Sequence, residues 1–125
     1  MSIEECLSRG DYNEAYCNAL SKSDPFVFVR LIGKTGIVLD ELDLDIIENV
    51  LSKAAELIIS GEFIELLINW IVVAIDKKYK LSNKLKRTLI RSISTVCENE
   101  KRIDEMQISE ANRVLNILKL DIKHH

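Results

Sequence analysis

The chain has 125 residues, of which 47% are hydrophobic and 30% are charged, and its formal net charge is −3. This length predicts one domain that can bury a core without disulfides or a metal, and the hydrophobic fraction excludes intrinsic disorder. Only four glycines and one proline are present. Because an all-β sandwich needs many more turn residues, long helices are expected.

The two histidines are the last two residues, His124 and His125. We interpret them as the remnant of a purification tag, which leaves residues 1–123 as a single α-helical protein-interaction domain. Without another histidine, the chain lacks a Ser-His or Cys-His catalytic pair and a common ligand of zinc and iron. We therefore expect a non-catalytic protein that uses no cofactor and no metal ion.

Capping signals predict three short helices at the start of the chain. Ser2 and Asp11 each precede a glutamate by three residues, which is the spacing of a capping box. Asp24 precedes Pro25, a proline at the first helical position, where its missing N–H is not needed. The third helix is expected over residues 26–32, and a linker to about residue 42 follows it.

Hydrophobic periodicity predicts four longer helices. Residues 44–60 are amphipathic, whereas residues 62–80 are apolar on every side and should be buried all round at the centre of the fold. Residues 83–102 follow a cap at Ser82, and residues 105–120 form a last amphipathic helix. The expected fold is all-α, with about seven helices in antiparallel pairs. They would form a short α-solenoid of armadillo or HEAT type, or an irregular bundle around the central helix.

The three cysteines, Cys6, Cys17 and Cys97, lie among apolar residues at helical spacing. We expect them to act as small hydrophobic side chains in a reducing compartment. The most apolar stretch, Leu57 to Ile75, is interrupted by polar residues. Since a membrane span needs about 20 apolar residues, no membrane segment is predicted.

Two short motifs are better explained as ordinary helix ends. Residues 33–35 read Gly-Lys-Thr, but Phe28 stands where a phosphate-binding loop needs a glycine, and a helix precedes the motif. The carboxylates between Asp40 and Glu48 lack the spacing of a calcium loop, and they suit the start of a helix instead.

Charge is unevenly distributed along the sequence. Residues 1–76 carry 14 acidic and 5 basic side chains, a net charge of −9, whereas residues 77–125 carry 6 and 12, a net charge of +6. Within the basic run 77–91, Lys84, Arg87 and Arg91 share one helix face. Such a face can bind an acidic protein segment or nucleic-acid phosphates, although a solvated helix end is the simpler alternative. Tyr79 is the only aromatic residue in the run, which favours a protein partner over single-stranded RNA.

Phe26 and Phe28 lie two positions apart on the short third helix, so they cannot share one face. One of them should reach a second packing surface or an exposed groove. Our candidate partner-binding residues are therefore in two groups, namely Phe26, Phe28 and Arg30 on the third helix and Lys84, Arg87 and Arg91 on the sixth.

The N-terminal residues carry a resemblance to a known family. The pattern consists of aromatic residues, alanines, a leucine and an aspartate at fixed spacing, here Tyr12, Ala15, Tyr16, Ala19, Leu20 and Asp24. It resembles the C-terminal α-helical domain of the Hedls/Varicose family, scaffold proteins that enhance mRNA decapping in processing bodies. The apolar helices that follow are similar in placement, whereas Glu41, Leu42 and Asp43 replace that family's usual Pro-Leu-Ser.

This resemblance implies a cytoplasmic, non-catalytic module of armadillo- or HEAT-like helix pairs in processing bodies. Its partners would be decapping enzymes, their activators or 5′–3′ decay factors. The chain is also similar to the C-terminal helical domains of WD-repeat proteins of the small-subunit processome, which carry a tryptophan on a long helix, as at Trp70. Direct RNA binding through residues 77–91, and self-association through the last helix, stay open as further possibilities.

Overall fold

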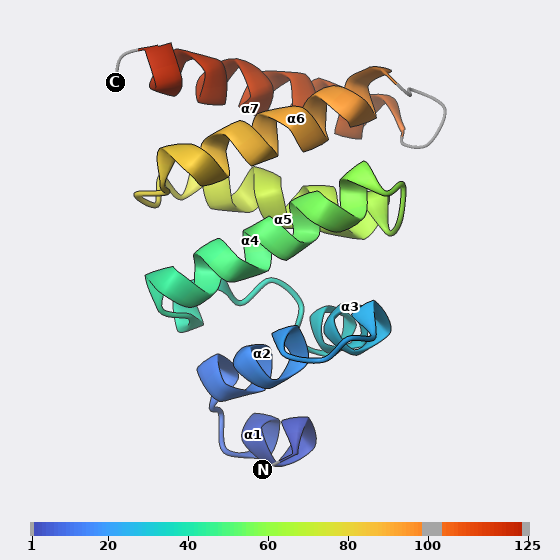
Figure 1. Ribbon diagram of the computed structural model, residues 1–125, viewed down its shortest axis with the longest axis vertical. Coiled ribbons are helices and arrows are strands. Elements are labelled where there is room, and N and C mark those ends of the chain that lie inside the picture. The colour runs from blue at the N-terminus through green and yellow to red at the C-terminus, as the bar shows by residue number, and fades with distance from the viewer. Residues whose placement is uncertain (1, 99–103, 124–125) are drawn as a thin grey trace. The chain divides into compact units, whose positions relative to one another are not determined.

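The computed structural model describes residues 2–98 and 104–123, which form seven α-helices, one 3₁₀ helix and no strand (Figure 1). The predicted all-α fold is therefore confirmed. The elements are α1 (Ile3–Ser8), α2 (Tyr12–Leu20), α3 (Pro25–Thr35), the 3₁₀ helix η1 (Leu39–Glu41), α4 (Leu44–Ile59), α5 (Ile64–Asp76), α6 (Asn83–Glu98) and α7 (Glu105–Lys123).

Side-chain caps begin the first two helices at the predicted residues. The Ser2 hydroxyl accepts a hydrogen bond from the backbone N–H of Glu5 at 3.2 Å, and the Asp11 carboxylate accepts one from that of Glu14 at 3.1 Å. Each bond satisfies a backbone donor that the first turn of a helix leaves without a partner.

Helix α3 is longer than the predicted 26–32. It begins after Asp24, whose carboxylate accepts a 2.9 Å hydrogen bond from the backbone N–H of Phe26. It continues to Thr35. The Gly-Lys-Thr motif thus lies in the last turn of a helix, as the sequence analysis favoured. Gly36 ends the helix with φ at 69°, a conformation that glycine adopts without steric cost.

The chain divides into two compact units, Met1–Val50 and Leu51–His125, and α4 begins in the first and continues into the second. We refer to them as unit 1 and unit 2 and describe each by itself. That residues 1–123 act as one interaction domain stays a prediction, and the proposed tag residues His124 and His125 lie outside the described part of the chain.

In unit 1, α2 packs against both α1 and α3. Tyr16 on α2 is fully buried, and its hydroxyl shares a 2.6 Å hydrogen bond with the Thr35 side chain at the end of α3. Burial raises the pKa of Tyr16 to about 12; the bond to Thr35 opposes the rise, and nearby Tyr12 adds to it. The bond therefore joins the two helices through a side chain that has lost its contact with water.

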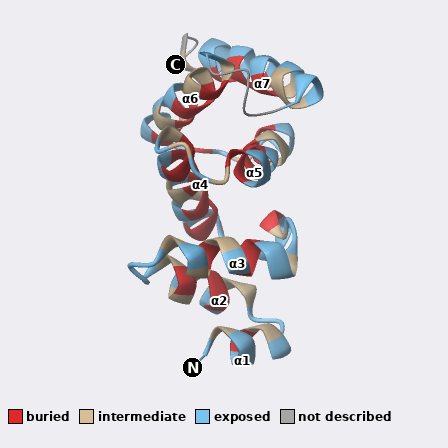
Figure 2. Cartoon of the chain, turned by 90° about the vertical axis from the view of Figure 1, so that its right-hand side faces the viewer, coloured by how far each residue is buried: buried red, intermediate tan, exposed pale blue. Residues whose placement is uncertain are grey.

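In unit 2, α5, α6 and α7 each contact the other two. The buried positions of α6 follow one stripe, as Figure 2 shows in red, and include Leu85, Leu89 and Ile93. Ser82 caps this helix as predicted, since its hydroxyl accepts a hydrogen bond at 3.2 Å from the N–H of Leu85. The last predicted residues of this helix, 99–102, lie outside the described residues, and α7 extends past its predicted end to Lys123.

The prediction for the central apolar helix is wrong in its length and in its burial. Helix α5 ends at Asp76 because Lys78 takes a left-handed backbone conformation, with φ at 60°. Seven of its residues, including Trp70, are buried, but Leu66 is exposed and Val72 is only half-buried. One broad face of α5 is therefore packed, while part of its apolar surface meets solvent.

The cysteine prediction is also wrong for one residue. Cys6 is buried and Cys97 is half-buried, but Cys17 is exposed. On α2 the buried side is formed by Ala15, Tyr16 and Ala19, and Cys17 lies outside it. Among the described helices, none is long and apolar enough to cross a membrane.

Candidate functional site

Exposed basic side chains lie along the α5–α6 connection and α6 in unit 2, and we call five of them the basic surface. They are Lys78, Lys80, Lys84, Arg87 and Arg91. Within the described residues, none of these five side chains forms an ion pair, although other lysines and arginines of the described residues do. Their positive charge is therefore not neutralised by described carboxylates.

Helix periodicity explains why the α6 members of this surface face outward together. Lys84, Arg87 and Arg91 are spaced i, i+3 and i+7, and the buried stripe that includes Leu85 and Leu89 lies on the opposite side. The structure thus brings together the three α6 residues that the sequence analysis selected.

The other candidate residues lie in unit 1, on α3. Phe26 is 56% exposed, whereas Phe28 is only 1% exposed and belongs to the core of that unit. The split of this pair between two surfaces agrees with the sequence argument, but Phe28 is not available on the surface as a partner contact. Arg30 is exposed and borders a small hollow that Lys34 also lines.

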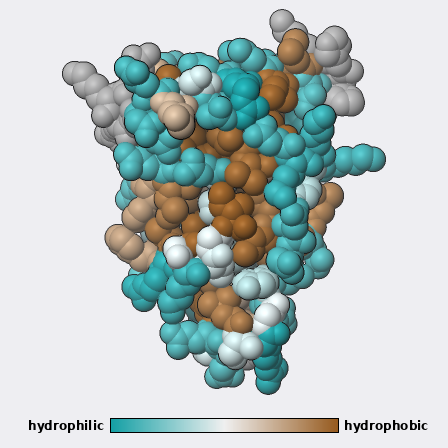
Figure 3. Space-filling model, turned by 180° about the vertical axis from the view of Figure 1, so that it is seen from behind, coloured by the Kyte–Doolittle hydropathy of each residue, from teal (hydrophilic) through white to brown (hydrophobic). Residues whose placement is uncertain are grey.

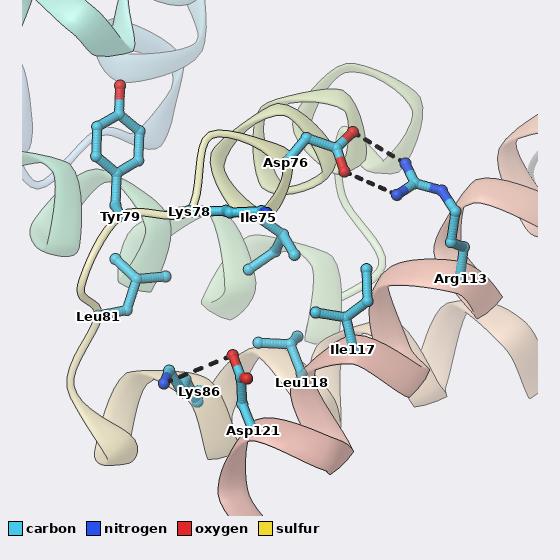
Figure 4. A pocket seen from close by; sticks show the side chains of 10 residues that line it. All are labelled: Ile75, Asp76, Lys78, Tyr79, Leu81, Lys86, Arg113, Ile117, Leu118 and Asp121. Atoms are coloured by element: carbon cyan, nitrogen blue, oxygen red, sulfur yellow. Dashed lines mark hydrogen bonds and ion pairs between the residues drawn. The ribbon is translucent and has the colours of Figure 1, made fainter.

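An open cleft of about 570 Å³ lies in unit 2 beside the basic surface (Figure 4). Its apolar lining comes from three segments: Ile75 at the end of α5, Leu81 just before α6, and Ile117 and Leu118 on α7. Ile117 is 37% exposed, while the other three are buried. The cleft therefore has an apolar floor that remains open to solvent at Ile117.

Two ion pairs border this floor on opposite sides in Figure 4. Arg113 on α7 binds Asp76 through two parallel hydrogen bonds of 2.7 and 2.9 Å, and Lys86 on α6 lies 3.8 Å from Asp121. The hydrogen bond from Arg113 holds the pKa of Asp76 below its usual range. Both lining carboxylates are therefore paired with a cation.

Lys78 and Tyr79 complete the cleft, and both come from the turn that follows α5. The Tyr79 ring points away from the Lys86–Asp121 pair, whereas Lys78 lies beside Ile75 (Figure 4). Lys78 is the one lining residue with a full charge for which the described chain offers no ion pair. An anion entering the cleft thus meets a positive charge that no described carboxylate neutralises.

The basic run is visible in the sequence, whereas the cleft is not. Helical periodicity places Lys86 toward the interior. It also places Ile117 outside the buried apolar stripe of α7. Neither signal indicates which charges on α7, such as Arg113 or Asp121, will meet α5 and α6. Which of these charges meet depends on how the helices pack, and the periodicity of a single sequence does not reveal that packing.

Unit 1 carries charge of the opposite sign. Desolvation raises the pKa of the exposed Cys17 thiol, and the carboxylates of Glu14, Asp45, Asp11 and Asp43 raise it further. These acidic side chains therefore lie near enough to Cys17 on α2 to act on its charge. In the described part of the chain, no group of three or more His, Cys, Asp or Glu side chains is placed to hold a metal ion.

Large apolar side chains also reach the surface. Figure 3 shows apolar residues on one face of the molecule, with hydrophilic residues around them. In unit 2 the large exposed examples are Leu66, Met106, Ile117 and Leu120. Of these, Ile117 alone lines the cleft beside the basic surface.

Comparison with known proteins gives one match. The sequence model of the family described as TORTIFOLIA1 C-terminal matches residues 2–120. No curated protein and no solved structure matches the chain.

This match overturns the resemblance to the Hedls/Varicose family, and with it the decapping function and the location in processing bodies. The alternative as a ribosome-biogenesis domain is wrong as well. The residues that carried the resemblance have general helical roles: Ala15 and Tyr16 pack α2, and Asp24 caps α3. Direct RNA contact by residues 77–91 and self-association stay predictions.

Proposed function

The chain belongs to the TORTIFOLIA1 C-terminal family, and we propose that it is a non-catalytic interaction domain of a microtubule-associated protein. In this proposal the basic surface binds an acidic segment of a protein partner. The observation that carries it is the set of five exposed cations for which the described residues offer no ion pair, on a chain whose net charge is negative.

The arrangement of charge on α6 supports an external anion. Arg87 lies three residues from Lys84 and four from Arg91, and like charges at these spacings each destabilise a helix by about 0.2–0.5 kcal/mol. Lys84 also lies in the first turn of α6, which holds no acidic residue, so its charge opposes the helix dipole there. These charges do not stabilise their own helix, whereas a bound carboxylate would relieve their repulsion.

The proposal of a non-catalytic role rests on the residues that the surface and the cleft contain. The cleft presents lysine, arginine, paired aspartates, a tyrosine and aliphatic side chains. These groups suit charge pairing and apolar contact with a partner. Recognition of a partner is the chemistry that these residues can supply.

Sedimentation of the purified chain with polymerised microtubules tests the proposal. We expect the wild-type chain to bind and the double variant Arg87→Glu, Arg91→Glu to bind about tenfold more weakly, since each exposed charge pair contributes up to about 1 kcal/mol. The matched control is Lys22→Glu, Lys119→Glu, which makes the same change in net charge at exposed sites outside the basic surface.

Circular dichroism should show thermal unfolding close to that of the wild type, because all four positions are exposed and each charge pair on α6 contributes only a few tenths of a kcal/mol, about 0.2–0.5. Equal binding by the Arg87, Arg91 variant and the wild type would show that the basic surface is not the contact. If the wild-type chain stays in the supernatant, the proposed role in microtubule association is wrong. The variants Phe26→Ser and Arg30→Glu test the α3 residues in the same assay.

A further inference from the structure

We propose that the cleft in unit 2 is an anchor site for an aliphatic side chain of the acidic partner segment, with Lys78 binding the carboxylate next to that side chain. This inference rests on the proposed function and specifies the chemistry of the partner. It turns a surface that attracts negative charge into a site that selects acidic segments carrying a leucine or a similar residue.

The apolar floor of the cleft suits a side chain of this kind, and the cleft has room for it and for the groups next to it. A space of about 570 Å³ falls in the range of ligand pockets, and its floor consists of Ile75, Leu81, Ile117 and Leu118. Because Ile117 is 37% exposed, apolar area at the floor is still in contact with water. An aliphatic side chain placed on it would remove that area from water, which is favourable in proportion to the area buried.

The charges around the floor favour a negative charge on the partner residue next to the aliphatic side chain. Asp76 and Asp121 are each paired with a cation of the cleft, so an incoming carboxylate need not displace either of them. Lys78 has no such pair within the described residues, and it lines the same cleft. A basic segment would instead meet the positive charge of Lys78 and would be repelled.

The backbone at Lys78 supports a role for this side chain. Its φ of 60° is a left-handed conformation that glycine adopts without cost but a residue with a Cβ does not. The turn is held by a hydrogen bond of 3.1 Å from the Lys78 N–H to the Ile75 carbonyl. A lysine here therefore gives up local stability and places its ammonium group at the rim of the cleft (Figure 4).

Fluorescence anisotropy with three labelled peptides tests the inference. One peptide is Glu-Glu-Leu-Glu-Glu, the second carries alanine in place of leucine, and the third carries lysines in place of the glutamates. We expect the wild-type chain to bind the leucine peptide roughly tenfold more tightly than the alanine peptide, which is the selectivity that a few buried methyl groups provide. The lysine peptide should not bind.

Three variants assign that preference to the cleft. Ile117→Asn should reduce binding of the leucine peptide to the level of the alanine peptide, without changing the affinity for the latter. Leu120→Asn is the matched control, because Leu120 is also exposed on α7 but does not line the cleft. Lys78→Gly should weaken both acidic peptides alike while the chain stays as stable as the wild type or more stable, because glycine suits the turn.

The outcomes separate this inference from the proposed function. Equal binding of the leucine and alanine peptides, or a leucine preference that survives Ile117→Asn, overturns the anchor site but leaves the basic surface intact. If the Lys78→Gly variant binds like the wild type, the assignment of the carboxylate to Lys78 is wrong. If neither acidic peptide binds the wild-type chain, the binding of acidic segments fails together with the anchor site.

Discussion

At the scale of single residues, the buried hydroxyl of Tyr16 joins α2 to α3. Tyr16→Phe removes its 2.6 Å hydrogen bond to Thr35, and we expect the free energy of unfolding to fall by about 1 kcal/mol. Thermal unfolding followed by circular dichroism measures this change. Tyr12→Phe is the control, because the Tyr12 ring is only partly buried.

The same tyrosine makes the stability of unit 1 depend on alkaline pH. Burial raises the pKa of Tyr16 from 10.0 to about 12, so the folded state holds the proton more tightly than the unfolded state does. The resulting stabilisation is complete below pH 10 and is lost as the pH rises to about 12. Tyr16→Phe should lack this loss, and an identical decline in the variant and the wild type would contradict the assignment.

At the scale of elements, the Asp76–Arg113 pair links the end of α5 to α7. Its two hydrogen bonds are parallel and short, yet both side chains are partly exposed. We therefore expect Asp76→Asn to lower the free energy of unfolding by only about 0.5–1 kcal/mol at neutral pH, as measured by urea denaturation. Glu62→Gln, at an exposed position before α5, is the control.

The pH dependence of that difference has a defined sign. The hydrogen bond from Arg113 lowers the pKa of Asp76 in the folded state, so the pair stabilises the fold above the ordinary value of 3.8. The stabilisation is lost as the pH falls through the lowered pKa, and wild type and Asp76→Asn should then become equally stable. If the free energies of unfolding of the wild type and Asp76→Asn still differ in strong acid, the difference does not come from the Asp76–Arg113 pair.

The sequence predicted local structure at this scale better than packing. The caps at Ser2, Asp11 and Ser82 depend on neighbours within a few residues, and the structure has all three. The burial of α5 depends on how many helices contact it, and there the apolar pattern over-predicted burial at Leu66. The end of α5 at the Lys78 turn was not predicted, because a lysine is not a residue type that indicates a left-handed backbone conformation.

The candidate site shows the same limit. Lys84, Arg87 and Arg91 were found because helical spacing alone places them on one face. The cleft beside them needs the contact of α7 with α5 and α6, which involves residues about 40 positions apart, as in the Arg113–Asp76 pair.

For the whole molecule, the separation of charge predicts how partner binding responds to salt. The basic surface is exposed, so its attraction for an acidic partner is screened over a Debye length that falls from about 30 Å at 0.01 M to about 3 Å at 1 M salt. Microtubule sedimentation in increasing potassium chloride should therefore show a progressive loss of binding.

The leucine preference of the cleft depends on burial of apolar area and not on charge. Its ratio of affinities, measured with the two acidic peptides, should stay nearly constant over the same salt series even as both affinities fall. A ratio that collapses with salt would indicate that the leucine peptide owes its advantage to electrostatics.

Cys17 offers a place to attach a reporter group to this protein. It is exposed while Cys6 is buried and Cys97 is half-buried, so a thiol-directed dye should react at Cys17 before the other two. Because desolvation and, after it, neighbouring carboxylates raise the pKa of Cys17, its thiolate form is scarce at neutral pH and labelling is best done in mildly alkaline buffer. Such a dye lies in unit 1, and the basic surface of unit 2 carries no modification while its partners are being measured.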